Sequence, residues 1–108
     1  MKRIVWLAVG IALAASAAFA TDDWDGTWAG GFDTPNGAQV IVAGNEAVGL
    51  FWRSDYVPGV ASSVEADGSL TLRWSSGTAT LKRTGARTAD GVFEEPGKDA
   101  VTVHLGRE

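Results

Sequence analysis

The chain has 108 residues with a formal net charge of -4, and it contains five Trp, fourteen Gly and no Cys. The negative charge argues against nucleic acid as a partner. The lack of cysteine excludes disulfides and the lipid-bearing cysteine of a bacterial lipoprotein, so packing alone must stabilise the fold.

The first 20 residues have the pattern of a secretory signal peptide. Lys2 and Arg3 precede an apolar run at 4–15, and Ala18-Phe19-Ala20 supplies the small residues of a cleavage site. The run is short for an uncleaved membrane anchor. We therefore expect a signal peptide at 1–20 and one domain at 21–108, periplasmic or secreted, without a membrane anchor after cleavage.

The remaining chain predicts a small all-β domain, because no segment sustains the spacing of an amphipathic helix. Apolar and polar residues alternate, and Gly, Asp or Asn interrupt the alternation every 8 to 12 residues or so. We expect a single antiparallel up-and-down β-barrel of about eight short strands. They are placed at 26–32, 38–43, 46–53, 60–66, 70–75, 78–83, 88–94 and 100–105.

Two hairpins near the middle of the chain predict one inward face. A loop at 67–69 would set Val64 opposite Leu72, and a Ser76-Gly77 turn would set Leu72 opposite Leu81. Both registers send the same parity inward. The predicted inner residues are Val64, Leu70, Leu72, Trp74, Ala79 and Leu81.

Two arginines end inward-facing rows of the predicted barrel. Arg83 has the parity of Leu81, and Arg107 continues the parity of Leu105 on the last strand. A charge in such a position is costly unless it is paired or stacked. On the first strand one parity alternates large aromatics with glycine, which permits strong bending. Its residues are Trp24, Gly26, Trp28, Gly30 and Phe32.

Gly26-Thr27-Trp28 resembles the Gly-x-Trp opening of calycin-like barrels, namely lipocalins, avidins and the small bacterial metalloprotease inhibitors. The resemblance implies that Trp28 closes one barrel end under an arginine, with Arg107 preferred and Arg83 as the alternative. The chain is short for a lipocalin or avidin. It is closer in size to the inhibitors, but it lacks their cysteine pair.

Candidate catalytic and metal motifs fail on their spacing. The acidic run at 22–25 lacks the carboxylates that a calcium loop needs, and His104 is the only histidine. No serine lies in a Gly-x-Ser-x-Gly elbow, and Glu95-Pro96-Gly97 is typical of a turn rather than an acid and base pair. We predict no catalytic residue, metal or cofactor.

The segment 50–59 is the predicted contact surface, because its aromatics have both parities. Either Phe51 or Trp52 must face outward, and a site centred on Trp52, Arg53 and Tyr56 has side chains that are typical of binding hot spots. The predicted function is therefore non-enzymatic binding of a protein or small ligand through a barrel end or the outer surface.

Two alternatives remain, and an enzyme ranks last. They are a carrier for a small apolar or sugar-like ligand, with an internal cavity of at least about 300 Å³, and a protease inhibitor. The sequence leaves the identity of the partner and the oligomeric state open.

Overall fold

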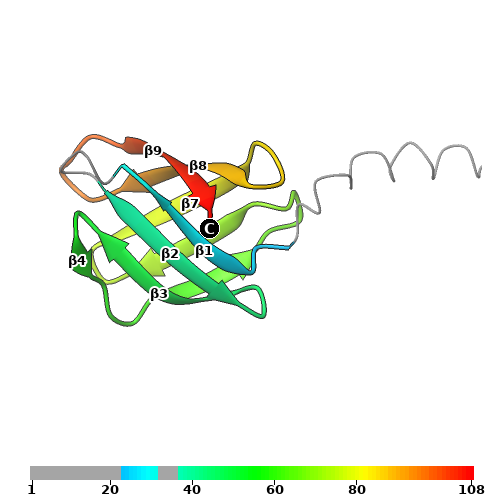
Figure 1. The fold of residues 1–108 in the computed structure, drawn as a ribbon. Helices are drawn as coiled ribbons and strands as arrows, with labels where there is room; N and C mark the ends of the chain where they lie inside the picture. Colours follow the sequence, from blue (N-terminus) through cyan, green and yellow to red (C-terminus); the bar gives the residue numbers. More distant parts are fainter. Residues whose placement is uncertain (1–22, 32–36) are drawn as a thin grey trace, which may run out of the picture.

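A computed structural model describes residues 23–31 and 37–108, and the predicted signal peptide and Phe32 lie outside this part. The described chain forms one antiparallel sheet of nine strands (Figure 1). None of its segments is a helix that could span a membrane. The strands are β1 (Gly26–Gly30), β2 (Ala38–Ala43), β3 (Glu46–Trp52), β4 (Asp55–Tyr56), β5 (Ala61–Val64), β6 (Leu70–Trp74), β7 (Gly77–Arg83), β8 (Thr88–Glu94) and β9 (Val101–Arg107).

The order of the strands is that of an up-and-down barrel. Neighbours in the sheet follow one another in sequence, except where β9 returns to pair with β1, in the order β4-β3-β2-β1-β9-β8-β7-β6-β5. The sheet curls until β3 approaches β5, and there the Ala47 N–H donates a 2.8 Å hydrogen bond to Ser62 Oγ. The predicted all-β barrel class is confirmed, with incomplete closure between β3 and β5.

Alternation of apolar and polar residues places one face of every long strand in a single core. On β2, for example, Ala38, Val40 and Val42 are buried while the residues between them are not. The inner face that the two hairpins predict is present, and Leu70, Leu72, Ala79 and Leu81 are all buried. The largest fully buried side chains are Trp24, Trp28, Phe93, Leu50, Leu70, Leu72, Leu81 and Val40.

Both predicted hairpin registers are wrong by two residues. Val64 lies opposite Leu70, and Leu72 lies opposite Ala79. The first loop is longer than predicted because Asp67 Oδ1 accepts hydrogen bonds from the backbone N–H and the hydroxyl of Ser69, at 3.0 and 2.7 Å. An even shift keeps every side chain on its predicted face, since the strand period is two.

The second turn consists of Ser75 and Ser76 rather than Ser76 and Gly77. Gly77 is already a strand residue and lies opposite Trp74 in the β6–β7 ladder. A Cβ at Gly77 would stand 2.6 Å from Glu94 O and 2.7 Å from Trp74 Cζ2. Only glycine lets β7 begin beneath the indole ring.

The predicted strand at 46–53 ends one residue early, and an additional strand follows it. Arg53 and Ser54 take positive φ angles of 57° and 70°, which turn the chain back on itself. β4 then pairs with the end of β3, with Tyr56 opposite Phe51. Two successive non-glycine residues in the left-handed region are uncommon, so sequence propensity gave no signal for this turn.

Candidate functional site

One end of the barrel is closed by two tryptophans whose rings pack against each other at a tilt of 55°. Trp24 and Trp28 are fully buried, with ring centroids 5.1 Å apart. The Trp28 indole N–H donates to Trp24 O at 2.8 Å, and the Trp24 indole N–H donates to Gly68 O at 2.9 Å. Both polar ends are therefore satisfied, and the rings fill this end of the core.

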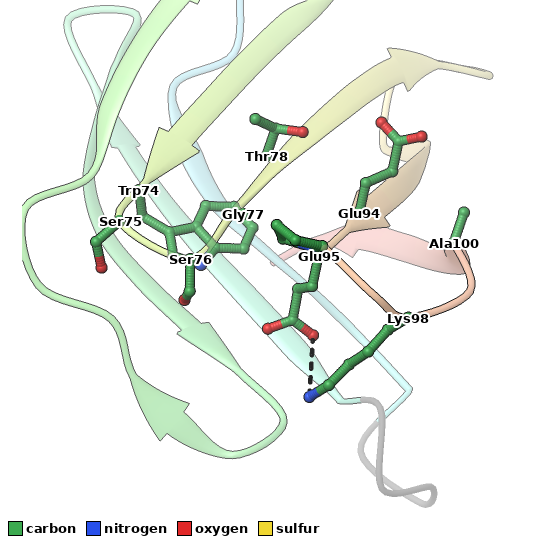
Figure 2. A pocket seen from close by; sticks show the side chains of 10 residues that line it. Trp74, Ser75, Ser76, Gly77, Thr78, Glu94, Glu95, Lys98 and Ala100 are labelled. Atoms are coloured by element: carbon green, nitrogen blue, oxygen red, sulfur yellow. Dashed lines mark ion pairs between the residues drawn. The ribbon is translucent and has the colours of Figure 1, made fainter.

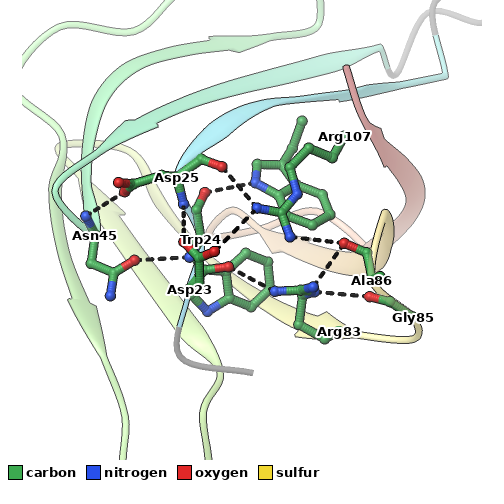
Figure 3. Close-up of polar contacts among 9 residues, drawn as sticks. Asp23, Trp24, Asp25, Asn45, Arg83, Gly85, Ala86 and Arg107 are labelled. Carbon is green, nitrogen blue, oxygen red and sulfur yellow. Dashed lines mark hydrogen bonds and ion pairs between the residues drawn. The ribbon is translucent and has the colours of Figure 1, made fainter. Parts of the chain in front are cut away.

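Two guanidinium groups cover these rings, and Figure 3 shows Arg83 and Arg107 at this end beside Trp24. Arg107 Cζ lies 4.7 Å from the centre of the Trp28 ring, and Arg83 Cζ lies 5.1 Å from the same centre. Trp28 is thus buried at this end of the barrel, and both candidate arginines lie over its ring. Gly26 makes room for this, because a Cβ there would meet Arg107 Cδ at 3.0 Å.

Backbone carbonyls hold the guanidinium groups in place. Arg83 donates to the carbonyls of Asp23, Gly85 and Ala86, and Arg107 donates to those of Asp25 and Ala86. Burial is the main cause that lowers the pKa of Arg83 from its usual value, and repulsion from the Arg107 charge lowers this pKa further. The arrangement gains cation–π and hydrogen-bond energy at the expense of placing two like charges together.

The acidic segment before β1 fastens this end from the outside. Asp25 Oδ1 accepts a 2.7 Å hydrogen bond from the Asn45 N–H, and Asn45 Oδ1 accepts one of 2.8 Å from the Trp24 N–H (Figure 3). The Asp25 and Asn45 side chains therefore hold the segment before β1 against the β2–β3 turn at the closed end of the barrel. A recess of about 180 Å³ lies at this end beside Asp67, Ser69 and Lys82.

The opposite end of the barrel carries an open groove of about 460 Å³ (Figure 2). The β6–β7 turn forms one wall with Ser75 and Ser76, and the connection from β8 to β9 forms the other with Glu95 and Lys98. The β7–β8 ladder brings the two walls together, since it pairs Thr78 with Glu94. This groove is the candidate site.

Trp74 is the aromatic surface of the groove. Its ring lies over Gly77 and packs against Phe93, with ring centroids 6.3 Å apart and an interplanar angle of 50°. Phe93 is itself buried and stacks on Trp52 at 4.2 Å and 10°. The contacts with Gly77 and Phe93 thus fix the position of the Trp74 ring, while Trp74 stays half-buried.

A small charge network borders the groove. Glu95 Oε1 lies 3.3 Å from Arg53 Nε and 3.9 Å from Lys98 Nζ, and only 15% of the Glu95 side chain is exposed. Arg53 Cζ also lies 4.9 Å from the centre of the Trp52 ring. The carboxylate is held between two cations, which orders this wall and balances its charge.

The three residues of the predicted contact surface do not form one surface. Trp52 is 4% exposed and points into the core, and among the described residues its indole N–H has no hydrogen-bond partner. Phe51 is the aromatic that faces outward, where it contacts Tyr56 edge to face at 5.6 Å. Tyr56 is 60% exposed. Of these three residues, only Arg53 adjoins the groove, through its ion pair with Glu95.

His104 and Asp90 form a hydrogen-bonded pair on the outer face of β8 and β9. Their Nδ1 and Oδ1 atoms are 2.7 Å apart, but the two side chains are 83% and 42% exposed. A pair on a convex, solvated surface has nothing that would exclude water or hold a substrate. Within residues 23–31 and 37–108, no cluster of three or more His, Asp or Glu side chains is placed to hold a metal ion.

Comparison of this chain with protein-family models, with curated proteins and with solved structures finds no match. The calycin resemblance therefore rests on the Gly26-Thr27-Trp28 motif and on the topology of the strands.

Proposed function

We propose that this chain is a non-enzymatic binding module of the periplasm or the extracellular space, and that it binds its ligand in the groove at the open end of the barrel. The observation that carries the proposal is the groove of about 460 Å³ beside a half-buried tryptophan. Small-molecule sites are typically concave, about 300–1,000 Å³ in volume, and combine aromatic surface with a few polar groups.

The packed interior supports this position over an internal cavity. Trp24, Trp28, Trp52 and Phe93 all lie within the described core, and each is at most 4% exposed. Four large aromatics in a barrel with strands of at most seven residues fill the space that a carrier would keep open. A ligand then has to bind at the end or on the outside.

The outer surface of β3 and β4 is the second candidate, because Val48 and Tyr56 are 61% and 60% exposed there. Exposed aromatic and aliphatic side chains of this kind are typical of protein contacts. Protein recognition, including protease inhibition, belongs with this surface. The two candidates can be separated by one substitution at each place.

A ligand screen read by NMR tests the proposal. Amide shifts of the purified protein are followed during addition of a library of sugars, amines, carboxylates, short peptides and amphiphiles. We expect a saturable compound to move the amides of 74–78 and 94–98, and Trp74→Ala to abolish its binding while Tyr56→Ala preserves it. Shifts confined to 48–56 and lost in Tyr56→Ala would move the site to the outer surface.

A further inference from the structure

The chemistry of the groove identifies a class of ligand, and this inference rests on the proposed function. Its first component is the Trp74 ring, which forms a flat apolar surface supported by Phe93 and open toward the groove. The face of an indole carries negative electrostatic potential, so it attracts polarised C–H groups or cations. The ligand should present one or the other to this ring.

The second component is a polar rim around the ring. Ser75 and Ser76 are exposed hydroxyl residues on the β6–β7 side, and Glu95 and Lys98 place a carboxylate and an ammonium group on the other wall (Figure 2). Hydroxyls both donate and accept hydrogen bonds, while an ionised carboxylate accepts them. The rim therefore suits a ligand that carries several groups able to do both.

The charge of the groove distinguishes between the two kinds of ligand for the ring. Of its charged lining residues, Glu95 is paired with Arg53 and Lys98, while the Glu94 side chain alternates with buried Phe93 and lies on the outer face of β8. Aromatic cages for ammonium groups gain their energy from desolvated cation–π contact. Here one half-buried ring faces an open, nearly balanced groove, which favours a neutral ligand.

We infer that the groove binds a neutral saccharide, with the C–H face of one pyranose ring against Trp74 and its hydroxyl groups bonded to the rim of Ser76, Glu95 and Lys98. A pyranose has an apolar face and an edge of groups that donate and accept. These are the complements of the two components above. Arg53 acts as a positioning residue, because its ion pair orders Glu95 and the wall behind the ligand.

Titrations with defined probes test the inference. Cellotriose, chitotriose and maltotriose are the neutral probes, and choline chloride and trigalacturonate are the charged ones, each added to millimolar concentration with amide shifts and Trp fluorescence as readouts. At least one neutral trisaccharide should bind saturably and move the amides of 74–78 and 94–95. Trp74→Ala should weaken it at least about tenfold, which corresponds to ~1.4 kcal/mol.

Two further variants keep the test decisive if Trp74→Ala does not fold. Lys98→Ala removes an exposed rim donor without touching the core, and it should also weaken the trisaccharide. Tyr56→Ala removes an exposed aromatic outside the groove, and it should leave binding unchanged. Equal affinity of the parent and the folded groove variants would overturn the saccharide site.

The probes also distinguish failure of the inference from failure of the proposed function. Binding of choline or trigalacturonate in the groove, with no response to the neutral trisaccharides, would overturn the saccharide class and leave the groove as a binding site. If no trisaccharide binds and the wider library moves no groove amide, both the inference and the proposed function fall.

Discussion

Arg107 and Trp28 are direct cross-strand partners in the β1–β9 ladder, and the Arg107 guanidinium carbon lies 4.7 Å from the centre of the Trp28 ring. The same guanidinium donates to Asp25 O at 2.9 Å and to Ala86 O at 2.8 Å. The Arg107 side chain thus links β9 to β1, to the residue just before β1 and to the β7–β8 connection. This contact joins the first and last strands of the chain, which are neighbours in the middle of the sheet.

Replacing Arg107 should therefore destabilise the fold without changing the groove. Arg107→Ala loses a cation–π contact and two hydrogen bonds, for which we expect a loss of about 1–3 kcal/mol of unfolding free energy. Arg107→Lys should lose less stability, because lysine keeps the charge. It should still be less stable than the parent, since lysine lacks the planar guanidinium fork. Urea denaturation of both variants measures this. The exposed Arg73→Ala serves as the control, and an equal loss there would contradict the interpretation.

Removal of the Trp28 side chain should cost most of the stability of the domain. Trp28 is fully buried, and its indole N–H donates to Trp24 O. Truncation of a buried tryptophan to alanine costs about 3–5 kcal/mol, against a total of about 5–15 kcal/mol for a typical domain. We expect Trp28→Ala to melt far below the parent, and half-buried Trp74→Ala to lose less. Melting of Trp28→Ala within a few degrees of the parent would show that the ring does not close the barrel.

The sequence predicted the strands and their inward faces well, because hydrophobic alternation reports the face of each residue directly. It did not determine the register, since a shift of two residues preserves every face. In the first hairpin the register depends on the hydrogen bonds between Asp67 and Ser69, which lengthen the loop. The alternation of inward and outward residues gives no information about such a local contact.

The groove was not predicted, for a different reason. Ser76 and Glu95 each lie in a segment that the sequence marks as a turn, and nothing local indicates that these turns meet. They converge only because β7 pairs with β8 so that Thr78 lies opposite Glu94. For Trp52, the sequence showed that one of two adjacent aromatics faces outward, but the choice depends on packing against Phe93.

The hydrogen bonds in the β5–β6 loop predict a dependence of stability on acid. The hydroxyl and backbone N–H of Ser69 lower the pKa of Asp67 below its usual value of 3.8. A carboxyl group whose pKa is lower in the folded state stabilises that state above its unfolded pKa, and this contribution is lost as the pH falls through the folded pKa. Stability from Asp67 should thus be complete at neutral pH and decline progressively as the pH falls below about 4.

Asp67→Asn and Ser69→Ala test this dependence through melting temperatures between neutral pH and about pH 2.5. Both variants should melt below the parent at neutral pH. The difference for Asp67→Asn should shrink as the parent carboxyl becomes protonated. A difference that stays constant across this range would show that the Asp67 charge contributes nothing to the loop.

Processing of the leader is a separate prediction, made from the sequence. Cleavage after Ala20 should yield a protein that begins at Thr21, because Ala18 and Ala20 are the small residues that signal peptidase requires. Intact mass spectrometry of the exported protein measures its N-terminus. Detection of Met1 in that fraction would contradict cleavage, and Ala20→Asp should slow processing if the site is correct.

The close approach of β1 to β9 gives the sharpest steric prediction. A Cβ at Gly30 would overlap the backbone carbonyl of His104, and a backbone group cannot move aside as a flexible side chain can. Gly30→Ala should therefore push β1 away from β9 and destabilise the closed sheet by about 1–3 kcal/mol or more. Gly49→Ala is a matched control within a strand, because its Cβ would meet only the Ile41 side chain, at 3.3 Å. Chemical denaturation of the two variants should give a large loss for Gly30→Ala and a small change for Gly49→Ala. Equal stability of the two would mean that β1 and β9 are farther apart than the structure places them, and the stacking of Arg107 on Trp28 would then have to be reconsidered as well.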